Sequence, residues 1–255
     1  MLLLLNTTKT MNLAADVPAR LKTSLPKQMK EASVLAGLLA QLNRPQLIEL
    51  MALSEKLADE TRANAALWGK ADRSRIPAIY GFTGLVYKSL DAGSLDAATR
   101  RQAQKKVRIL SGLYGVLRPF DLIEAYRLEM GQRLAAGGAR NLVEFWRDDL
   151  TSTLNEDLKN GEPIISVAAQ EYMKALDFKQ LKGPVIAPVF KERRHNGSLK
   201  TVAVHSKKAR GELVRYCLIS KARKPKDLLG FNALGWEAAE DPPEAGPWLF
   251  TRPES

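Results

Sequence analysis

Thiols and imidazoles are scarce in this chain of 255 residues, which contains one cysteine and two histidines. A single thiol, Cys217, excludes a framework of disulfide bonds. The same scarcity excludes a zinc finger and a cluster held only by thiolates. Because no His, Cys and carboxylate residues cluster along the sequence, we expect no metal site, no other cofactor and no direct chelation of iron.

Long apolar runs are also missing. The apolar start, Met1–Leu5, meets polar residues at once and is too short for the apolar region of a signal peptide. No run approaches the ~18 apolar residues that suggest a membrane-spanning helix. We therefore expect a soluble, cytoplasmic protein without a membrane partner, in which residues 2–5 form a buried strand.

The remaining composition is that of an ordinary globular protein, with 45% apolar and 26% charged residues. The spacing of apolar residues predicts a mixed α/β (α+β) fold in one domain over residues 1–255, with helices around a mixed sheet. Predicted strands occupy residues 2–5, 164–168, 185–194, 198–204 and 248–251. Predicted helices occupy residues 27–42, 45–57, 96–110, 141–158 and 207–220, and a loop is predicted over 77–90. Because strands and helices do not alternate strictly, a doubly wound sheet is not predicted.

Positive charge is concentrated in one segment. The chain has 39 Lys and Arg against 28 Asp and Glu, and residues 191–226 hold twelve of the former and two of the latter, so this segment carries +10 of the total +11. Such a segment can bind a polyanion by displacing counterions from phosphates, or can simply be a solvated surface. Because it lies on predicted strands and a helix, the polyanion interpretation is favoured. Predicted helix 96–110 carries a second basic patch.

Two short motifs are candidates for phosphate binding. The first, KKARG at residues 207–211, places cations at a predicted helix start, where they are unfavourable unless a phosphate supplies the countercharge. Its alternative is a solvated first turn. The second, SGLYG at residues 111–115, follows a predicted helix and has the outline of a helix-hairpin-helix, in which backbone N–H groups face a phosphate. Its alternative is a helix C-cap followed by an ordinary turn.

Longer blocks of the sequence carry a resemblance. They are LSGLYGVLRPFDL at residues 110–122, YRLEMG at 126–131, KKARG at 207–211, and GFN with the following GW at 230–236. The chain resembles the YaaA family of peroxide stress resistance proteins nearly end to end. The resemblance implies a cytosolic protein of oxidative defence that protects DNA and keeps free iron low. It also implies binding of double-stranded DNA in a positively charged cleft with a helix-hairpin-helix-like element.

The sequence departs from the family pattern at two places. Residues 6–10 read NTTKT where the family usually has a Ser-Pro-Ala-Lys-Thr type loop, so Lys9 and Thr10 remain. Around Gly84, the family commonly has Lys and Asp where this chain has Thr83 and Leu85. These departures favour binding over catalysis.

Two hypotheses for function follow. The first is a non-enzymatic protein, favoured as a monomer, whose basic helix and glycine turn line one DNA-binding cleft. Its predicted phosphate-binding residues are Lys9, Arg108, Ser111, Gly112, Tyr114, Gly115, Arg118, Tyr126, Arg127, Lys207, Lys208 and Arg210, with His205 as a further contact. The alternative is an enzyme that acts on a phosphorylated small molecule or a nucleic-acid base in the same cleft. Tyr126, Glu129 or Lys9 would then transfer protons. No nucleotide-binding glycine loop or Gly-x-Ser-x-Gly motif supports catalysis. For Arg127 a buried Arg–Glu pair is an equal alternative.

Overall fold

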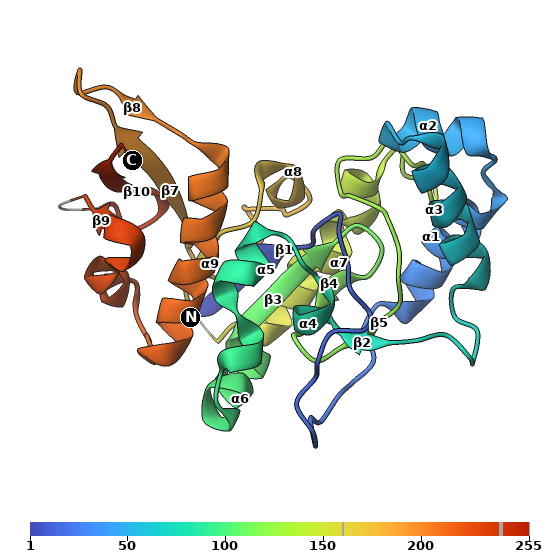
Figure 1. Ribbon diagram of the computed structural model, residues 1–255, viewed down its shortest axis with the longest axis horizontal. Coiled ribbons are helices and arrows are strands. Elements are labelled where there is room, and N and C mark those ends of the chain that lie inside the picture. Colours follow the sequence, from blue (N-terminus) through green and yellow to red (C-terminus); the bar gives the residue numbers. More distant parts are fainter. Residues whose placement is uncertain (160, 240–241, 255) are drawn as a thin grey trace.

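The computed structural model describes residues 1–159, 161–239 and 242–254. Within these residues, a mixed sheet of eight strands has the order β4-β3-β1-β6-β7-β10-β9, with β8 paired to β7 (Figure 1). The strands are β1 (Leu2–Asn6), β3 (Val107–Ser111), β4 (Gly115–Leu117), β6 (Ile164–Ser166), β7 (Val185–Arg193), β8 (Leu199–Lys200), β9 (Glu237–Ala238) and β10 (Gly246–Pro253). A separate short pair joins β2 (Ile76–Pro77) to β5 (Leu122–Ile123).

The five central strands of the sheet are parallel. Numbered along the chain, β1, β3, β6, β7 and β10 lie in the order 2-1-3-4-5, and β4, β8 and β9 pair antiparallel to them. This is one of the two common orders of doubly wound sheets. The expectation that the sheet is not of this type is therefore wrong. Several helices and β2 separate β1 from β3, and only the four-residue helix Gln170–Met173 separates β6 from β7, so the alternation is hidden in the sequence.

Strand β1 forms the centre of the sheet because its side chains are apolar on both faces. Leu2–Leu5 are all buried, and β1 pairs in parallel with β3 on one side and β6 on the other. A parallel strand covered on both faces needs such a continuous apolar run. The prediction of a buried strand at residues 2–5 is confirmed.

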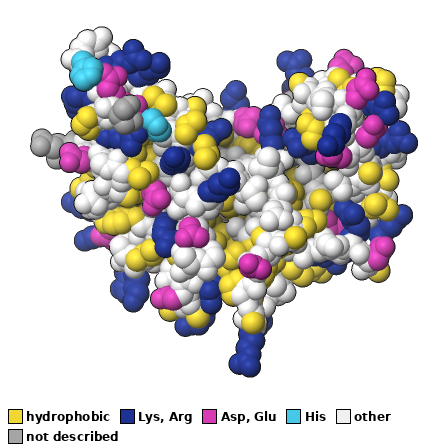
Figure 2. Space-filling view, in the orientation of Figure 1, with side chains coloured by type: hydrophobic (Ala, Val, Ile, Leu, Met, Phe, Trp, Pro, Cys, Tyr) yellow, Lys and Arg dark blue, Asp and Glu magenta, His cyan; other side chains and the backbone are white. Residues whose placement is uncertain are grey.

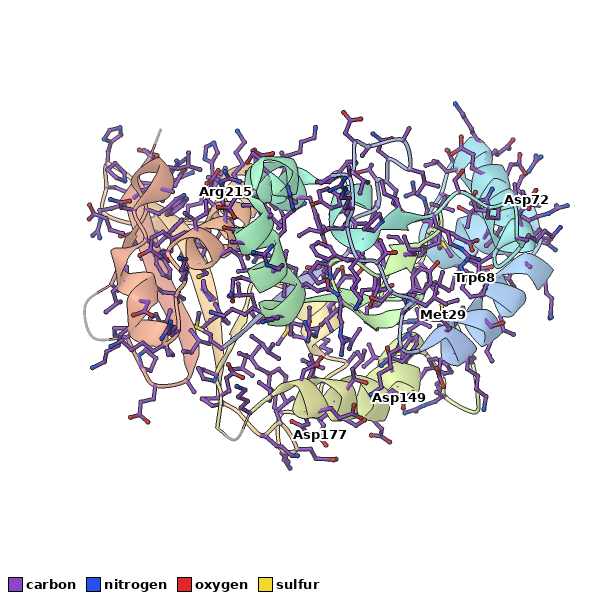
Figure 3. The ribbon with its side chains drawn as sticks, turned by 90° about the horizontal axis from the view of Figure 1, so that it is seen from below. Met29, Trp68, Asp72, Asp149, Asp177 and Arg215 are labelled. Atoms are coloured by element: carbon purple, nitrogen blue, oxygen red, sulfur yellow. The ribbon has the colours of Figure 1, made fainter. Side chains whose placement is uncertain are left out.

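Helices cover both faces of the sheet. Figure 3 places α7 on one side and α5, α6 and α9 on the other. The α-helices are α1 (Met29–Gln41), α2 (Arg44–Met51), α3 (Glu55–Leu67), α4 (Ala78–Gly81), α5 (Leu85–Leu90), α6 (Ala97–Lys106), α7 (Leu142–Asp157), α8 (Gln170–Met173) and α9 (Ala203–Ile219). Short 3-10 helices lie at η1 (Ala92–Ser94), η2 (Pro225–Gly230) and η3 (Ala233–Gly235). None of the described helices combines the length and apolar character needed to cross a bilayer.

Several predicted elements are confirmed and four are corrected. The helix predicted over 45–57 is divided between α2 and α3, because the chain turns at residues 52–54. The helices at 27–42 and 141–158 and the Asn196-Gly197 turn between β7 and β8 are present. The helix predicted to reach residue 110 ends at Lys106, because the apolar run that follows pairs with β1 as β3. The segment 77–90 contains α4 and α5 instead of a loop. The second hairpin strand is only two residues long, so α9 begins at residue 203.

Helices α1, α2 and α3 form a group on one side of the sheet, away from β7, β8 and α9 (Figure 1). The surface of the molecule is hollowed between these two raised parts (Figure 2). The buried apolar residues nevertheless form one continuous cluster that includes β1, β3, α1 and α9.

Candidate functional site

Polar side chains gather where three neighbouring strands end. Asn6 ends β1, Ser111 ends β3 and Ser166 ends β6. In open sheets of this strand order, ligands bind outside the carboxyl ends, at the point where the order reverses. Here that point lies between β1 and β6, so the fold places a candidate site at this edge, which we call the carboxyl edge.

Lys9 lies at the carboxyl edge between acidic groups. Its Nζ is 3.0 Å from Glu129 Oε2. Glu171, on α8 directly after β6, is the second carboxylate: burial raises its pKa, the charge of Glu129 raises it further, and Lys9 opposes the shift. The structure thus brings together Lys9 and Glu129, two residues that the enzyme hypothesis names separately as candidates for proton transfer. Glu171 was missed, although an acidic residue soon after a buried strand is a sequence signal for such a site.

Two tyrosine hydroxyls complete this edge. The Tyr172 hydroxyl lies 3.0 Å from Thr7 Oγ1, and the Tyr126 hydroxyl lies 2.7 Å from Ser111 Oγ. Burial raises the pKa of both tyrosines well above the ordinary value. Both phenols therefore keep their protons at neutral pH, and they are suited to donate hydrogen bonds rather than to accept protons from a substrate.

The glycine turn, residues 111–115, joins two antiparallel strands. Ser111 Oγ accepts hydrogen bonds from the backbone N–H groups of Leu113 and Tyr114, at 3.2 and 2.9 Å. The Tyr114 hydroxyl is buried and accepts a hydrogen bond from Trp68 Nε1 at 2.9 Å. Since β3 precedes the turn and β4 follows it, the expectation that it connects two helices is wrong: it is a β-hairpin turn.

Both glycines of this turn are required by close packing. A Cβ at Gly112 would lie 2.5 Å from the Leu128 carbonyl oxygen. Gly115 has a φ of 70°, and its Cβ would lie 2.8 Å from the Trp146 ring. The turn therefore fits against the loop that holds Tyr126, and a phosphate could reach it only if these contacts were given up.

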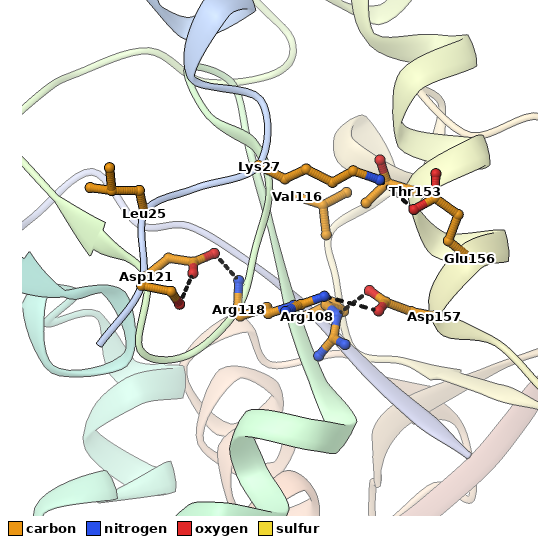
Figure 4. Close-up of a pocket in the computed structure, with 10 residues that line it drawn as sticks. Leu25, Lys27, Arg108, Val116, Arg118, Asp121, Thr153, Glu156 and Asp157 are labelled. Carbon is orange, nitrogen blue, oxygen red and sulfur yellow. Dashed lines mark hydrogen bonds and ion pairs between the residues drawn. The ribbon is translucent and has the colours of Figure 1, made fainter. Parts of the chain in front are cut away.

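Arg108 and Arg118 lie in a different place, around a cavity of about 270 Å³ (Figure 4). Arg108 Nε donates to Asp157 Oδ2 at 2.5 Å, and Arg118 Nη2 lies 3.5 Å from Asp157 Oδ1. Burial alone would raise the pKa of Asp157, but the hydrogen bond and charge of Arg108 outweigh burial and lower it. Arg108 also donates to the carbonyl oxygens of Gln104, Lys105 and Val107. Its charge and donors are thus satisfied within the protein, toward the end of β3 that is remote from Ser111.

The KKARG block lies within α9 rather than at its start. The helix begins at Ala203, four residues before Lys207, so the expected placement of these cations at a helix N-terminus is wrong. Lys207 and Lys208 are exposed and form no ion pair with any described residue. A Cβ at Gly211 would lie 2.2 Å from the Val86 carbonyl oxygen, so this glycine permits close contact between α9 and α5.

Arg210 is the unusual member of the block. Its side chain is largely buried, and Nε is inaccessible to solvent and has no hydrogen-bond partner among the described residues. Burial lowers its pKa, and no described carboxylate forms an ion pair with it. A buried N–H donor without an acceptor is unfavourable, and such a group in a native protein calls for an explanation such as a bound ion or water.

The other predicted contacts differ in their surroundings. His205 Nδ1 lies 2.7 Å from Glu192 Oε1, which also accepts from Arg252. His205 is therefore already paired within the protein. Arg127 is partly exposed and forms no ion pair within the described part of the chain, which does not match the Arg–Glu alternative. Cys217 is buried, as expected.

Strand order and the polar carboxyl edge define a protein of the doubly wound α/β type, with basic residues exposed on a helix beside the sheet. Among the residues described, no three His, Cys, Asp or Glu side chains are arranged to hold a metal ion. A family model described as peroxide stress protein YaaA matches residues 1–242. The chain belongs to this family, as the resemblance of the central block implies.

Related proteins cover the same length. A UPF0246 protein of Flavobacterium johnsoniae is 39% identical over 254 residues, which is 99% of this chain and all of the relative. One from Marinomonas sp. is 38% identical, with 99% of this chain and 97% of the relative covered. One from Idiomarina loihiensis is 38% identical, with 100% and 99% covered.

Proposed function

We propose that this protein binds double-stranded DNA, largely without sequence specificity, through a positively charged cleft. We further propose that it acts in the cytoplasm as a monomer and protects against oxidative, iron-dependent damage. Membership in the peroxide stress family supports the physiological part. The binding part rests on the surroundings of Arg210.

The unpaired guanidinium of Arg210 carries the proposal. The planar fork of an arginine guanidinium matches the oxygens of a phosphate, and Nε of Arg210 is a donor that the described residues leave without an acceptor. The exposed Lys207 and Lys208 lie on the same helix, add positive charge and form no ion pair with a described residue. Phosphate contacts of this kind position a duplex but do not read its bases, so sequence-tolerant binding is expected.

The charge around α9 extends over an ordered surface. Figure 2 shows Lys and Arg side chains gathered over the β7–β8 end of the molecule. Nine basic residues of the segment 191–226 are exposed and form no ion pair with a described residue: Arg193, Arg194, Lys200, Lys207, Lys208, Lys221, Arg223, Lys224 and Lys226. These charges lie on β7, β8 and α9, in the turn that joins β7 to β8 and in residues 221–226, which follow α9. Such an ordered basic surface is favoured over a flexible basic tail as a site for a polyanion.

The test is a titration of labelled duplex at several salt concentrations. Lys207→Glu combined with Lys208→Glu should weaken binding of all sequences alike and make the slope of log K against log salt shallower by about 1.8. Lys179→Glu combined with Lys182→Glu changes the net charge equally at exposed positions away from α9 and serves as the control. No binding by the unaltered protein at low salt, or binding that does not depend on salt, would eliminate the proposal.

The second candidate function is an enzyme that acts on a phosphorylated small molecule or a nucleic-acid base. The ion pair between Lys9 and Glu129, with Glu171 beside it at the carboxyl edge, favours it. A carboxyl group whose pKa is raised is closer to the range useful in general acid–base catalysis. A thermal-shift screen of phosphorylated metabolites tests this function, and Glu171→Gln should abolish any turnover found while leaving ligand binding measurable.

A further inference from the structure

A second basic surface lies away from α9, between the chain segment 18–24 and helix α6. It lines a groove of about 630 Å³. Six of its lining residues are cations and none is Asp or Glu: Arg20, Lys22, Arg100, Arg101, Lys105 and Arg118. The floor between them contains apolar groups, among them Phe120. We call this the α6 groove.

Most of these cations are free to meet an anion. Arg20, Lys22, Arg101 and Lys105 are exposed and form no ion pair with any residue that the structure describes. Arg118 is an exception, because its Nη2 lies 3.5 Å from Asp157 Oδ1. The cations that line the groove outnumber the one carboxylate paired with them, so we expect the groove to attract anions.

Both walls of the α6 groove are fixed. Asp96 caps α6 by accepting from the Thr99 backbone N–H at 2.6 Å, so the cations of this wall stand on a well-formed helix. The opposite segment is tied down at its end, where Ser24 Oγ donates to Asp121 Oδ1 at 2.6 Å. The two walls meet through Phe120, whose backbone N–H donates to Gln104 Oε1 at 2.8 Å. A ligand would therefore find the backbone positions that carry these cations already fixed.

The spacing of the charges suits a phosphodiester chain. Arg101 and Lys105 are four residues apart on α6, so they lie on one side of the helix about 6 Å apart along its axis. Each strand of a duplex carries one phosphate per about 3.4 Å of helix axis, so two cations with this separation can reach neighbouring phosphates of one strand. Four of the six cations are arginines, whose planar forks match phosphate oxygens. Arg20, at the tip of the opposite wall, has a φ of 62°, a conformation uncommon for arginine.

We infer that the α6 groove binds the phosphate backbone of double-stranded DNA, as a contact surface separate from α9. This inference rests on the proposed function and adds to it a second, sequence-independent contact. It explains why the basic residues of α6, which lie outside the +10 segment, are exposed beside other cations rather than paired with carboxylates on the surface.

The first arm of the test reverses charge in the groove. Arg101→Glu combined with Lys105→Glu should weaken duplex binding at least tenfold and make the salt slope shallower by about 1.8. Lys179→Glu combined with Lys182→Glu has the same net charge and should change affinity by less than about threefold, because remote charges act only through screened long-range attraction. Circular dichroism and thermal melting confirm that both variants are folded.

The second arm detects occupation of the groove directly. Ala97 is exposed at the groove, and the native Cys217 is buried with its pKa raised to about 12, so Ala97→Cys supplies the one reactive thiol. Saturating duplex should slow labelling of this thiol at least fivefold and leave a control thiol at Lys179→Cys unaffected. Sodium tripolyphosphate and polyglutamate are tested in place of the duplex.

The inference requires both results. Failure of the unaltered protein to bind duplex overturns this inference together with the proposed function. Normal binding by the Arg101/Lys105 variant, or an unprotected thiol at position 97, overturns the groove alone and leaves the proposed function standing. Protection by tripolyphosphate or polyglutamate but not by duplex assigns the groove to a different anion and also overturns the inference.

Discussion

Two arginines that look alike in the sequence stand in opposite surroundings. Arg108, on β3, is buried and donates to Asp157 and to three backbone carbonyl oxygens. Arg210, on α9, is largely buried and leaves Nε without an acceptor. Each belongs to a run of basic residues, and the sequence predicts a phosphate contact for both. The difference teaches that two arginines in basic runs can have different roles: the donors of Arg108 serve the fold, whereas Nε of Arg210 is not used by any described residue.

The strongest test of this comparison is the stability of the Arg108 site. Arg108→Met should lower the free energy of unfolding by about 3–5 kcal/mol, because it leaves the Asp157 carboxylate without its buried partner. Arg118→Met, which removes the exposed partner of the same carboxylate, should cost less than about 1 kcal/mol. Urea denaturation followed by circular dichroism measures both. Equal losses of stability in the two variants would contradict the expectation that the buried ion pair with Asp157 contributes more than the exposed one.

The second prediction concerns the packing that holds α9, and so Arg210, against α5. Gly211→Ala should destabilise by about 1–3 kcal/mol, since its Cβ would meet backbone atoms that cannot rotate away. Gly37→Ala on α1 is the matched control: no atom lies within 4 Å of its Cβ, and it should stabilise by up to about 1 kcal/mol through helix propensity. Urea midpoints compare the two, and a neutral Gly211→Ala would mean that α5 and α9 can separate freely.

The third prediction is a change in the free energy of unfolding that is zero or opposite in sign to the change expected for Arg108→Met. Arg210→Met should leave the free energy of unfolding unchanged or raise it by about 1 kcal/mol, because it replaces an unpaired buried cation by an apolar side chain. The same variant should weaken duplex binding roughly tenfold, which corresponds to one lost phosphate contact. Denaturation and fluorescence anisotropy of the same sample give both numbers. A loss of stability as large as that of Arg108→Met would show that Arg210 makes a stabilising interaction within the protein, which contradicts this account.

The smallest expected effect is the pH dependence at Glu171. Burial, with the charge of Glu129, raises the pKa of Glu171 in the folded state, so folding favours its protonated form. Its stabilising contribution is complete below the unfolded pKa of about 4.3 and is lost as pH rises through the folded value. Glu171→Gln should therefore be more stable than the parent at neutral pH by less than about 1 kcal/mol, and equally stable near pH 3. A difference that persists at acid pH would contradict this account.

The sequence predicted the outline of the fold well where apolar patterns are local. The buried strand at residues 2–5 and the helix over 141–158 follow from composition and spacing alone. Residues 107–110 are predicted as the end of a helix because a short apolar run fits either a helix or a strand. Its partner, β1, lies about a hundred residues away in the chain, and this long-range pairing decides the outcome. The same holds for the parallel order of the sheet.

The candidate sites were predictable in part. Lys9 and Glu129 were named separately, but only the fold shows that they form an ion pair. Arg20 and Lys22 carry no motif, and they become part of a groove because segment 18–24 crosses α6. The lack of an acceptor for Arg210 Nε depends on every neighbour of that atom, so no pattern of residues could have indicated it.

The enclosed position of Cys217 has a consequence for a family named for peroxide stress. Hydrogen peroxide oxidises the thiolate, and burial keeps this sulfur protonated and out of reach. The chain offers no second cysteine with which a disulfide could form within it. An oxidant that damages other proteins through their thiols therefore finds no accessible thiol here.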